Sequence, residues 1–418
     1  MIAENLFLSS TIILSIVILN IVHVPRVIRF SLNWILVWAL IASFNIFGAE
    51  FYPTKSLLLF LFFVSILMLF AIGKRRVFVI QSAQEFENYQ LQFVLLEKLV
   101  KIIYFAIIPI MIIVAIKSII LLQSYNIYDF RREVFSSDSG VLPSGFLPIY
   151  TLIIGGLSKF SLIVSIFLFS KGRGKKYVLL PFIVSVLSSM ITLGRFPIYE
   201  FILLLVLSLY TERKITFKHV IYGALGFSLL IGFSMYRSGG YYGLSEILQR
   251  HIIGYHTYGF YLLEYKIDST NVLSDSWLGL ASTGSFGYFI SLPFTWVSNF
   301  VTYMQSSYFL LQDDFVRVGS TMDGRPMLVN AFYTILYEPY LDFGFIGVLA
   351  QSLIIGFIIR VLTLSSKVRI VSEAALIFIG SILIGGIMKS PFIRHDIIIP
   401  CFLFFILYFI FKQRNVNE

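Results

Sequence analysis

The chain has 418 residues, of which 58% are hydrophobic and 13% are charged, and its mean hydropathy is +0.88. This composition excludes a soluble globular domain and indicates an integral membrane protein. A net charge of +10 would suggest a nucleic-acid partner in a soluble protein, but many Lys and Arg residues here lie in short loops between apolar segments, where they set membrane orientation. We therefore expect no nucleic-acid partner.

Apolar segments of roughly 18 or more residues recur along most of the chain, and a helix of that length crosses about 30 Å of hydrocarbon. Hydropathy predicts an all-α, polytopic protein with about eleven spans. The first span follows Glu4 and lacks a small-residue cleavage site, so we expect it to be retained. The spans are expected near residues 6–24, 31–49, 56–73, 99–122, 146–170, 177–194, 196–210, 218–236, 343–363, 371–388 and 396–411.

Cationic clusters occupy alternate loops between these spans. Because Lys and Arg are enriched in cytoplasmic loops, the alternation predicts an outside N terminus and a cytoplasmic C terminus. The clusters are Arg26 and Arg29, Lys74 to Arg76, Lys171 to Lys176, Arg213 to Lys218, Arg360 to Arg369, and Lys412 with Arg414.

Three regions follow from this topology: spans in 1–236, a large external loop in 237–330, and spans in 331–418. Within the loop, Trp277 to Met304 resembles a span, but a crossing there would put the Arg360 to Arg369 cluster outside. We therefore expect a re-entrant or interfacial segment. On the cytoplasmic side, Lys74 to Lys98 has the pattern of a surface helix.

Several sequence motifs of enzymes are missing from the chain. It has no phosphate-binding loop, no dinucleotide fingerprint, no His-Glu-x-x-His and no Cys pair, since Cys401 is the single cysteine. A cytoplasmic enzyme that uses ATP or a nucleotide sugar is therefore disfavoured. We expect no cofactor and no metal, and a donor delivered by the membrane itself.

Arginines gather on the predicted outer side. Arg195 lies in a tight turn between two spans, Arg237 ends the 218–236 span, and Arg250 and Arg325 lie in the external loop. A guanidinium group binds phosphate oxygens through two parallel hydrogen bonds, so several together would suit a lipid-linked diphosphate. The plainer interpretation of each is an interfacial Arg paired with a carboxylate or a lipid headgroup. Arg195, between two apolar helices and close to Glu200 in the chain, departs from that interpretation more convincingly than Arg317.

Carboxylates and histidines on the same side are candidates for a general base. Asp323, Glu338 and Asp342 precede or begin the 343–363 span, and His251 and His256 lie in the loop. Any of them could deprotonate a sugar hydroxyl, a contribution of about 10²–10⁴-fold. Asp342 before Phe343 and Gly344 could instead order a helix start, and a loop histidine is more often solvated.

Further polar and aromatic residues could bind substrate. The candidates are Tyr241 and Tyr242, which could stack on sugar rings as several other loop aromatics could, and Lys389 and Arg394 in the last outer turn. Membrane interfaces use the same aromatic residues as anchors. Lys159 lies near the centre of the 146–170 span, and Glu200 is its candidate partner, which would make the pair structural.

The chain resembles the O-antigen polymerase (Wzy-type) family of oligosaccharide repeat-unit polymerases. The resemblance lies in the Leu193 to Pro197 turn, in Tyr236-Arg237 before a large loop, in Asn330 to Thr334, and in Tyr340-Leu341-Asp342-Phe343-Gly344-Phe345-Ile346-Gly347. The arginine spacing described for some members, Arg followed by ten residues and Gly, does not occur at Arg195, Arg237, Arg250 or Arg325.

The resemblance implies a GT-C-like glycosyltransferase of the bacterial inner membrane. It would transfer a growing glycan from undecaprenyl diphosphate onto a new lipid-linked repeat unit outside the membrane. Arg195, Arg237 and Arg325 would hold the diphosphate without a metal, and Asp342, or else Asp323 or His256, would take the proton. Arg250 and Arg317 would assist substrate binding. A flippase and a chain-length regulator would be partners.

Two other functions remain open at this stage. An O-antigen ligase shares the architecture and the donor, but its His-centred motif is not found at His251 or His256. A flippase or other transporter often shows two related halves and a polar site near the midplane. No halves are apparent here, and Lys159 is the one feature that favours transport.

Overall fold

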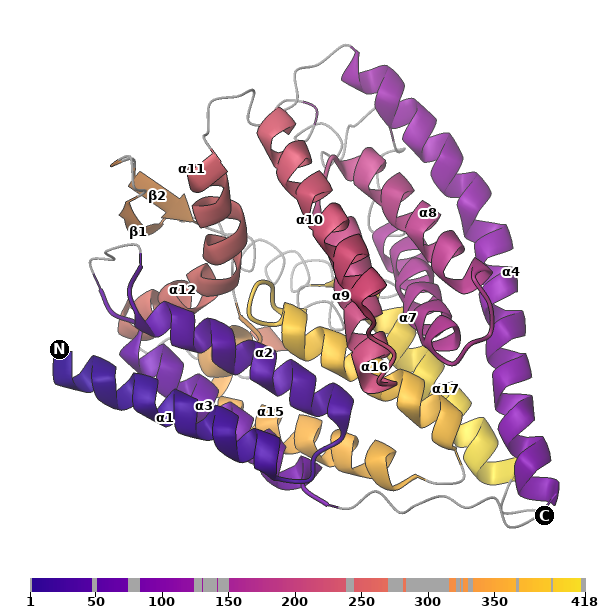
Figure 1. Ribbon diagram of the computed structural model, residues 1–418, viewed down its shortest axis with the longest axis horizontal. Coiled ribbons are helices and arrows are strands. Elements are labelled where there is room, and N and C mark those ends of the chain that lie inside the picture. Colours follow the sequence, from indigo (N-terminus) through magenta and orange to yellow (C-terminus); the bar gives the residue numbers. More distant parts are fainter. Residues whose placement is uncertain are drawn as a thin grey trace, which may run out of the picture. The chain divides into compact units, whose positions relative to one another are not determined.

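The structure is a computed structural model of the whole chain, and its elements are labelled in Figure 1. It describes residues 2–46, 51–73, 83–123, 130, 141, 150–237, 244–269, 281–282, 316–320, 324, 326–329, 334–365, 368–391 and 394–414. The chain divides into two compact units. Unit 1 comprises Met1–Arg75, Ser238–Thr363 and Ile379–Arg394, and unit 2 comprises Arg76–Arg237, Leu364–Phe378 and His395–Glu418.

Unit 1 is built from helices and one small hairpin. Its helices α1, α2 and α3 lie against one another, as Figure 1 shows, and α12 packs on α2 and α3. The elements are α1 (Ile2–Ile21), α2 (Arg26–Ser43), α3 (Thr54–Ala71), α11 (Leu244–Leu248), a π-helical turn (Gln249–Gly254), α12 (Tyr255–Ser269), β1 (Val316–Ser320), β2 (Pro326–Val329), α15 (Tyr337–Leu364) and the second part of α16 (Arg369–Gly385).

Unit 2 is helical throughout its described residues. Helix α7 packs against α4, α8, α9 and α17, so it forms the centre of the unit. The elements are α4 (Ala83–Leu122), a π-helical turn (Tyr150–Gly155), α7 (Gly156–Ser170), α8 (Lys176–Thr192), α9 (Phe196–Thr211), α10 (Phe217–Arg237), the first part of α16, a 3₁₀ turn (His395–Ile397) and α17 (Ile398–Arg414).

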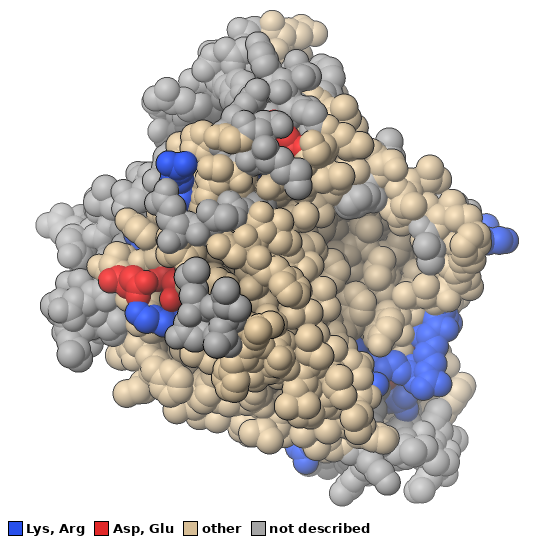
Figure 2. Space-filling view, turned by 60° about the vertical axis from the view of Figure 1, so that its left-hand side comes forward, with Lys and Arg blue, Asp and Glu red and all other residues tan. Residues whose placement is uncertain are grey.

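Helices occur in all eleven segments in which hydropathy predicts a span. Uncharged side chains also predominate among the described residues on the face drawn in Figure 2. The chain is therefore an all-α membrane protein with little sheet. Six helices of the described chain are long and apolar enough to cross a membrane: Arg26–Ser43, Thr54–Ala71, Phe86–Leu122, Tyr150–Ser170, Tyr337–Leu364 and His395–Gln413.

The predicted surface helix in Lys74 to Lys98 is not a separate element. Helix α4 starts at Ala83 and continues without interruption to Leu122, a length of 40 residues. No Gly or Pro occurs between Ala83 and Pro109, so nothing in the sequence ends the helix before the apolar part. The polar turns are thus the first turns of a long apolar helix.

Helix α12 shows that part of the predicted external loop is packed core. Phe260 and Leu262 are fully buried, and the ring of Phe260 lies 4.7 Å from that of Phe60 in α3. The Tyr261 hydroxyl donates a 2.9 Å hydrogen bond to the carbonyl of Ala42 at the end of α2. The predicted re-entrant segment Trp277 to Met304 lies outside the described residues, apart from Ala281 and Ser282.

Helix α15 is broken near its start. Phe343 (φ −141°, ψ 17°) and Gly344 (φ 58°, ψ −138°) leave helical geometry, and the helix resumes after them. Only glycine adopts the Gly344 conformation without steric strain. At Gly347 a Cβ atom would lie 1.9 Å from the carbonyl oxygen of Pro339. Gly344 therefore permits the break in the helix, and Gly347 permits its backbone to lie close to the carbonyl group of Pro339.

We predict that Gly347→Ala destabilises the protein by about 3 kcal/mol or more, since backbone cannot yield to the added methyl group as a flexible side chain would. Thermal unfolding of the detergent-purified protein measures the effect. Gly223→Ala in α10 is the matched control, because no atom lies within 4 Å of its added Cβ. Equal melting temperatures for the two variants would contradict the close approach.

Candidate functional site

Two carboxylates are buried on the short helical segment before the break in α15. Glu338 and Asp342 are four residues apart, so they lie on one face of that segment. Asp342 is fully buried, and both of its oxygens accept backbone hydrogen bonds, from the N–H of Ala281 at 3.0 Å and of Ser282 at 2.6 Å. This carboxylate therefore ties the 281–282 segment to α15.

Glu338 faces the turn that follows α16. The Ser390 hydroxyl donates a short hydrogen bond to Glu338 Oε2, and both residues are buried. The N–H of Ile335 donates a 2.6 Å hydrogen bond to the carbonyl of Gly386, which fixes the segment before α15 against the same turn. The start of α15 and the end of α16 thus meet at Glu338 and Ser390.

Gln351, which lies in α15 after the break, also contacts the segment before α15. Its Nε2 donates a 2.9 Å hydrogen bond to the carbonyl of Ile335. Its Oε1 is buried and has no hydrogen-bond partner among the described residues. A buried acceptor without a donor is costly, so such a group is suited to a donor on a ligand. We call Glu338, Gln351 and Ser390 the polar corner.

Two of the predicted substrate-binding cations border the polar corner. Lys389 is exposed and directly precedes Ser390. Arg394 is half-buried, and its guanidinium lies over Gly385, 4.0 Å from the position of an added Cβ atom. The last turn therefore carries one cation next to Ser390 in the chain and a second one over Gly385, and such cations can bind an anionic ligand.

His256, the other described candidate for a base, lies elsewhere in unit 1. It is buried between α12 and α2, with its ring stacked on Trp38 at 4.1 Å and edge-on to Trp34 at 5.5 Å. The Nδ1 atom is 2.6 Å from the carbonyl oxygen of Ile252, which can only accept, so Nδ1 carries the proton. Burial lowers the pKa of His256 to about 4, and the ring is neutral at pH 7.

Two further loop cations of unit 1, Arg250 and Arg317, have local partners. Arg250 Nε forms a 3.0 Å ion pair with Glu246, one turn earlier and buried. Arg317 lies exposed on β1, and its guanidinium donates to Ser320 at 3.3 Å. The pairing of Arg250 with a carboxylate fits its interfacial interpretation. Arg325, Asp323, Tyr241 and Tyr242 lie outside the described residues.

Arg195 and Arg237 belong to unit 2. Arg195 is half-buried in the turn before α9, and its carbonyl accepts a 3.1 Å hydrogen bond from the N–H of Tyr199. Leu193, two residues earlier, adopts a left-handed conformation (φ 46°, ψ 31°) that ends α8. Arg237 is the last residue of α10, and the structure does not describe its side chain. Their predicted joint action on a diphosphate stays a prediction.

Lys159 and Glu200 form the ion pair that the sequence suggests. The ammonium group of Lys159 in α7 donates to Glu200 Oε1 in α9, with side chains only 3% and 12% exposed. A buried pair of opposite charges neutralises two groups that would be costly alone in a membrane. The pair therefore joins α7 to α9.

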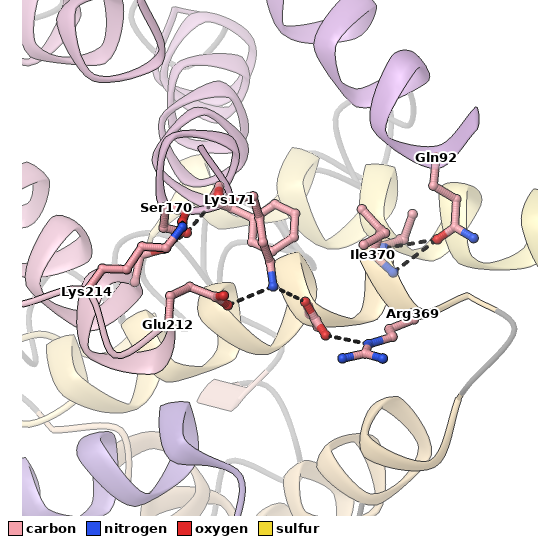
Figure 3. Close-up of polar contacts among 11 residues, drawn as sticks. Gln92, Ser170, Lys171, Glu212, Lys214, Arg369 and Ile370 are labelled. Carbon is pink, nitrogen blue, oxygen red and sulfur yellow. Dashed lines mark hydrogen bonds and ion pairs between the residues drawn. The ribbon is translucent and has the colours of Figure 1, made fainter. Parts of the chain in front are cut away.

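A second polar network in unit 2 was not expected from the sequence (Figure 3). Lys171, at the end of α7, lies 2.7 Å from Glu212 after α9 and 2.7 Å from Glu373 in α16. Arg369 also pairs with Glu373, at 2.9 Å. The basic loops were interpreted only as orientation signals, yet their cations hold helix ends together. Lys171 and Glu373 are separated by about half the chain, so no local pattern shows the contact.

Gln92 provides a hydrogen-bond acceptor for the backbone N–H groups at the start of α16 (Figure 3). Its Oε1 accepts hydrogen bonds from the N–H groups of Ile370 at 3.1 Å and Val371 at 3.4 Å. The first N–H groups of a helix have no partner inside the helix, so a side-chain acceptor stabilises them. The polar first turns of α4 thus have a structural role.

Within the described part of the chain, no three His, Cys, Asp or Glu side chains gather closely enough to hold a metal ion. Comparison of the chain with protein-family models, with curated proteins and with solved structures finds no match. The resemblance to the repeat-unit polymerases stays a prediction drawn from the motifs themselves.

We predict that Lys159→Met destabilises the protein by about 3–5 kcal/mol, because Glu200 is left as a buried charge without its cation. The double variant Lys159→Met with Glu200→Leu should recover most of the loss, since both charges are then absent. Unfolding of the purified protein in detergent compares the three proteins. A double variant as unstable as the single one would contradict a structural pair.

We predict that His256 makes stability depend on pH. Its pKa is about 4 in the folded chain and about 6.5 when unfolded, so between these values only the unfolded chain binds the proton. The free energy of unfolding should therefore fall as pH drops from 6.5 to 4, by about 3 kcal/mol in total. His256→Phe keeps an aromatic ring on Trp38 but cannot titrate. Identical pH profiles for the variant and the wild type would contradict a buried neutral histidine.

Proposed function

We propose that this protein is a glycosyltransferase that joins lipid-diphosphate-linked oligosaccharide repeat units into a polysaccharide of the O-antigen or capsule type. The reaction takes place on the outer face of the cytoplasmic membrane. The N terminus lies outside, the C terminus lies in the cytoplasm, and the fold is GT-C-like with about eleven spans. The carrier lipid is undecaprenyl diphosphate.

The observation that carries this proposal is the polar corner beside Lys389 and Arg394. The Tyr340 to Gly347 motif, on which much of the family resemblance rests, forms the break in α15 and lies next to this corner. A carboxylate shielded from water can accept a proton from a hydroxyl group, and cations next to it can bind a diphosphate. Those are the two requirements of glycosyl transfer from a lipid diphosphate.

The mechanism needs only side chains of the protein. A hydroxyl group of the acceptor unit attacks the anomeric carbon of the donor, and the bond from that carbon to the diphosphate oxygen breaks. Lys389 and Arg394 stabilise the charge that develops on the leaving diphosphate. Arg195, Arg237 and Arg325 are the further proposed ligands of the lipid diphosphate. A carboxylate removes the proton of the attacking hydroxyl.

Ion pairing of Lys159 weakens the case for a transporter. Lys159 is the residue that favours transport in the sequence, because transporters place polar substrate sites near the membrane midplane. The pair with Glu200 gives Lys159 a structural role instead. Experiment distinguishes a ligase from a polymerase, because a ligase acts after the polymer has formed.

We predict that a strain lacking this protein accumulates single repeat units on the external face and shows no polymer ladder on a gel. Wild-type protein should restore the ladder. The double variant Lys389→Ala with Arg394→Ala should lower the amount of polymer by about tenfold or more, the effect of losing charge-assisted hydrogen bonds to a diphosphate. Arg195→Ala tests the proposed ligand in unit 2 in the same gel.

Lys412→Ala is the matched control, because Lys412 is an exposed cation near the end of α17 over the ring of Tyr408. It should leave the ladder unchanged at equal protein amount. Repeat units trapped on the cytoplasmic face in the deletion strain would indicate a flippase instead. Polymer that forms but never reaches its final acceptor would indicate a ligase.

A further inference from the structure

Two basic turns of unit 2 are held together at one end of its helices. The first turn joins α7 to α8, and the second joins α9 to α10. Lys214 of the second turn donates a 2.6 Å hydrogen bond from Nζ to the carbonyl of Ser170, the last residue of α7 (Figure 3). Lys171 of the first turn lies 2.7 Å from Glu212 of the second. The cations of the two turns therefore share one surface.

Inner cations of these turns engage three carboxylates. Lys171 pairs with both Glu212 and Glu373, and Arg173 lies 3.5 Å from Glu97. Four further cations are exposed, and none of them has an ion-pair partner among the residues that the structure describes. We call these four the basic patch: Lys175, Lys176, Arg213 and Lys218.

The helices themselves do not favour cations at these positions. Lys175 and Lys176 lie at the start of α8, and Lys218 is the second residue of α10. The N-terminus of a helix carries the positive end of its dipole, so a cation there opposes helix formation. Neither helix has an acidic side chain in its first turn. Lys176 lies 5.0 Å from the centre of the Tyr177 ring, a contact that leaves its charge without a counter-ion. The patch therefore suits an anion that is not part of the chain.

An exposed apolar stripe continues from each of these two helix starts. In both helices a lysine is followed, three and seven residues later, by apolar side chains that are 38% to 58% exposed. Positions with this spacing lie on one face of a helix. The two sets are Lys176, Leu179 and Ile183 on α8, and Lys218, Ile221 and Leu225 on α10. Each lysine thus stands at the end of an apolar face that the described protein leaves exposed.

Apolar side chains also occur within the second turn. Phe217, directly before Lys218, is 77% exposed, and Ile215 is 41% exposed. Exposed apolar side chains among cations are typical of segments that lie in the headgroup region of an anionic membrane. An anion with hydrocarbon chains therefore matches the patch and the stripes together, whereas a soluble anion matches the patch alone.

We infer that the basic patch binds anionic phospholipids, with their phosphates on its four cations and their acyl chains along α8 and α10. A zwitterionic phospholipid brings its own cation beside the phosphate, so it gains less from cations without counter-ions. The surface lies on the side that the sequence predicts to be cytoplasmic, and the length of α8 separates it from Arg195. The inference is independent of the proposed glycosyl transfer.

The test measures lipid binding to the full-length protein purified in detergent. The probes are dioleoyl phosphatidylglycerol and dioleoyl phosphatidylcholine, each with a fluorescent label on an acyl chain, and fluorescence anisotropy reports binding. Each cation near an anionic lipid strengthens binding by about fivefold, so wild type should prefer phosphatidylglycerol by about tenfold or more. In about 1 M salt, which screens charges beyond about 3 Å, this preference should largely disappear.

Variants assign the preference to the patch. The quadruple variant Lys175→Gln, Lys176→Gln, Arg213→Gln and Lys218→Gln should bind both lipids with equal affinity. Lys218→Gln alone should weaken binding of phosphatidylglycerol by about fivefold. Lys117→Gln is its matched control, because Lys117 is an exposed cation near the other end of α4. It should bind like wild type, and Arg213→Lys, which keeps the charge, should retain the preference.

Three results would overturn the inference. Wild type could bind the two lipids equally, or the quadruple variant could keep the wild-type preference, as expected if the cations only orient the chain during insertion. Inorganic phosphate at constant ionic strength could displace phosphatidylglycerol as well as unlabelled phosphatidylglycerol does, which would assign the patch to free phosphate. Because the four cations have no ion-pair partner to lose, the quadruple variant should melt no lower than wild type. If it does not fold, the salt dependence of wild type and the comparison of Lys218→Gln with Lys117→Gln decide the matter.

Discussion

The constraint on which this structure depends is the need to satisfy backbone N–H groups where helices begin or break inside an apolar protein. In hydrocarbon no water replaces a missing hydrogen bond, so each such group needs a partner from the chain. The chain supplies polar side chains from distant segments. Gln92 accepts from the start of α16, Asp342 accepts from Ala281 and Ser282, and Glu264 in α12 accepts a 2.7 Å hydrogen bond from the N–H of Ser56 near the start of α3.

These contacts explain why the few buried acidic and amide side chains lie where they do. Burial raises the pKa of Glu264, while backbone hydrogen bonds from Ser56 and Lys55 oppose the shift, so the carboxylate offsets part of its own cost by capping α3. The Lys171 network similarly neutralises the carboxylates of Glu212 and Glu373. Glu338 likewise accepts a hydrogen bond from the Ser390 hydroxyl, where the start of α15 meets the turn after α16. The polar corner is thus one of the places where polar side chains hold helix ends together.

The helices could be predicted from the sequence because hydropathy and span length are local properties. Every predicted apolar segment contains a helix, and even the partner of Lys159 could be named, since a cation within a span needs an opposite charge and Glu200 is the acid of the predicted span 196–210. The break in α15 could not be predicted, although Gly344 permits it, because glycine is common in membrane helices. The burial of α12 was also missed, since its Tyr and His residues resemble those of an interfacial loop.

The candidate site was only partly predictable, because its contacts join segments that are distant in the sequence. Lys389, Arg394 and Glu338 could be listed as outer polar residues. The contact between Glu338 and the turn that carries the two cations joins segments about fifty residues apart, so it could not be predicted.

The measurement that tests the central claim most directly is the product balance of the purified protein in vesicles loaded with lipid-linked repeat units, without nucleotide and with a metal chelator. The account predicts glycans lengthened by whole repeat units and one lipid diphosphate released for each unit joined. Repeat units that cross the vesicle membrane unchanged, or that leave the lipid without being joined, would contradict it.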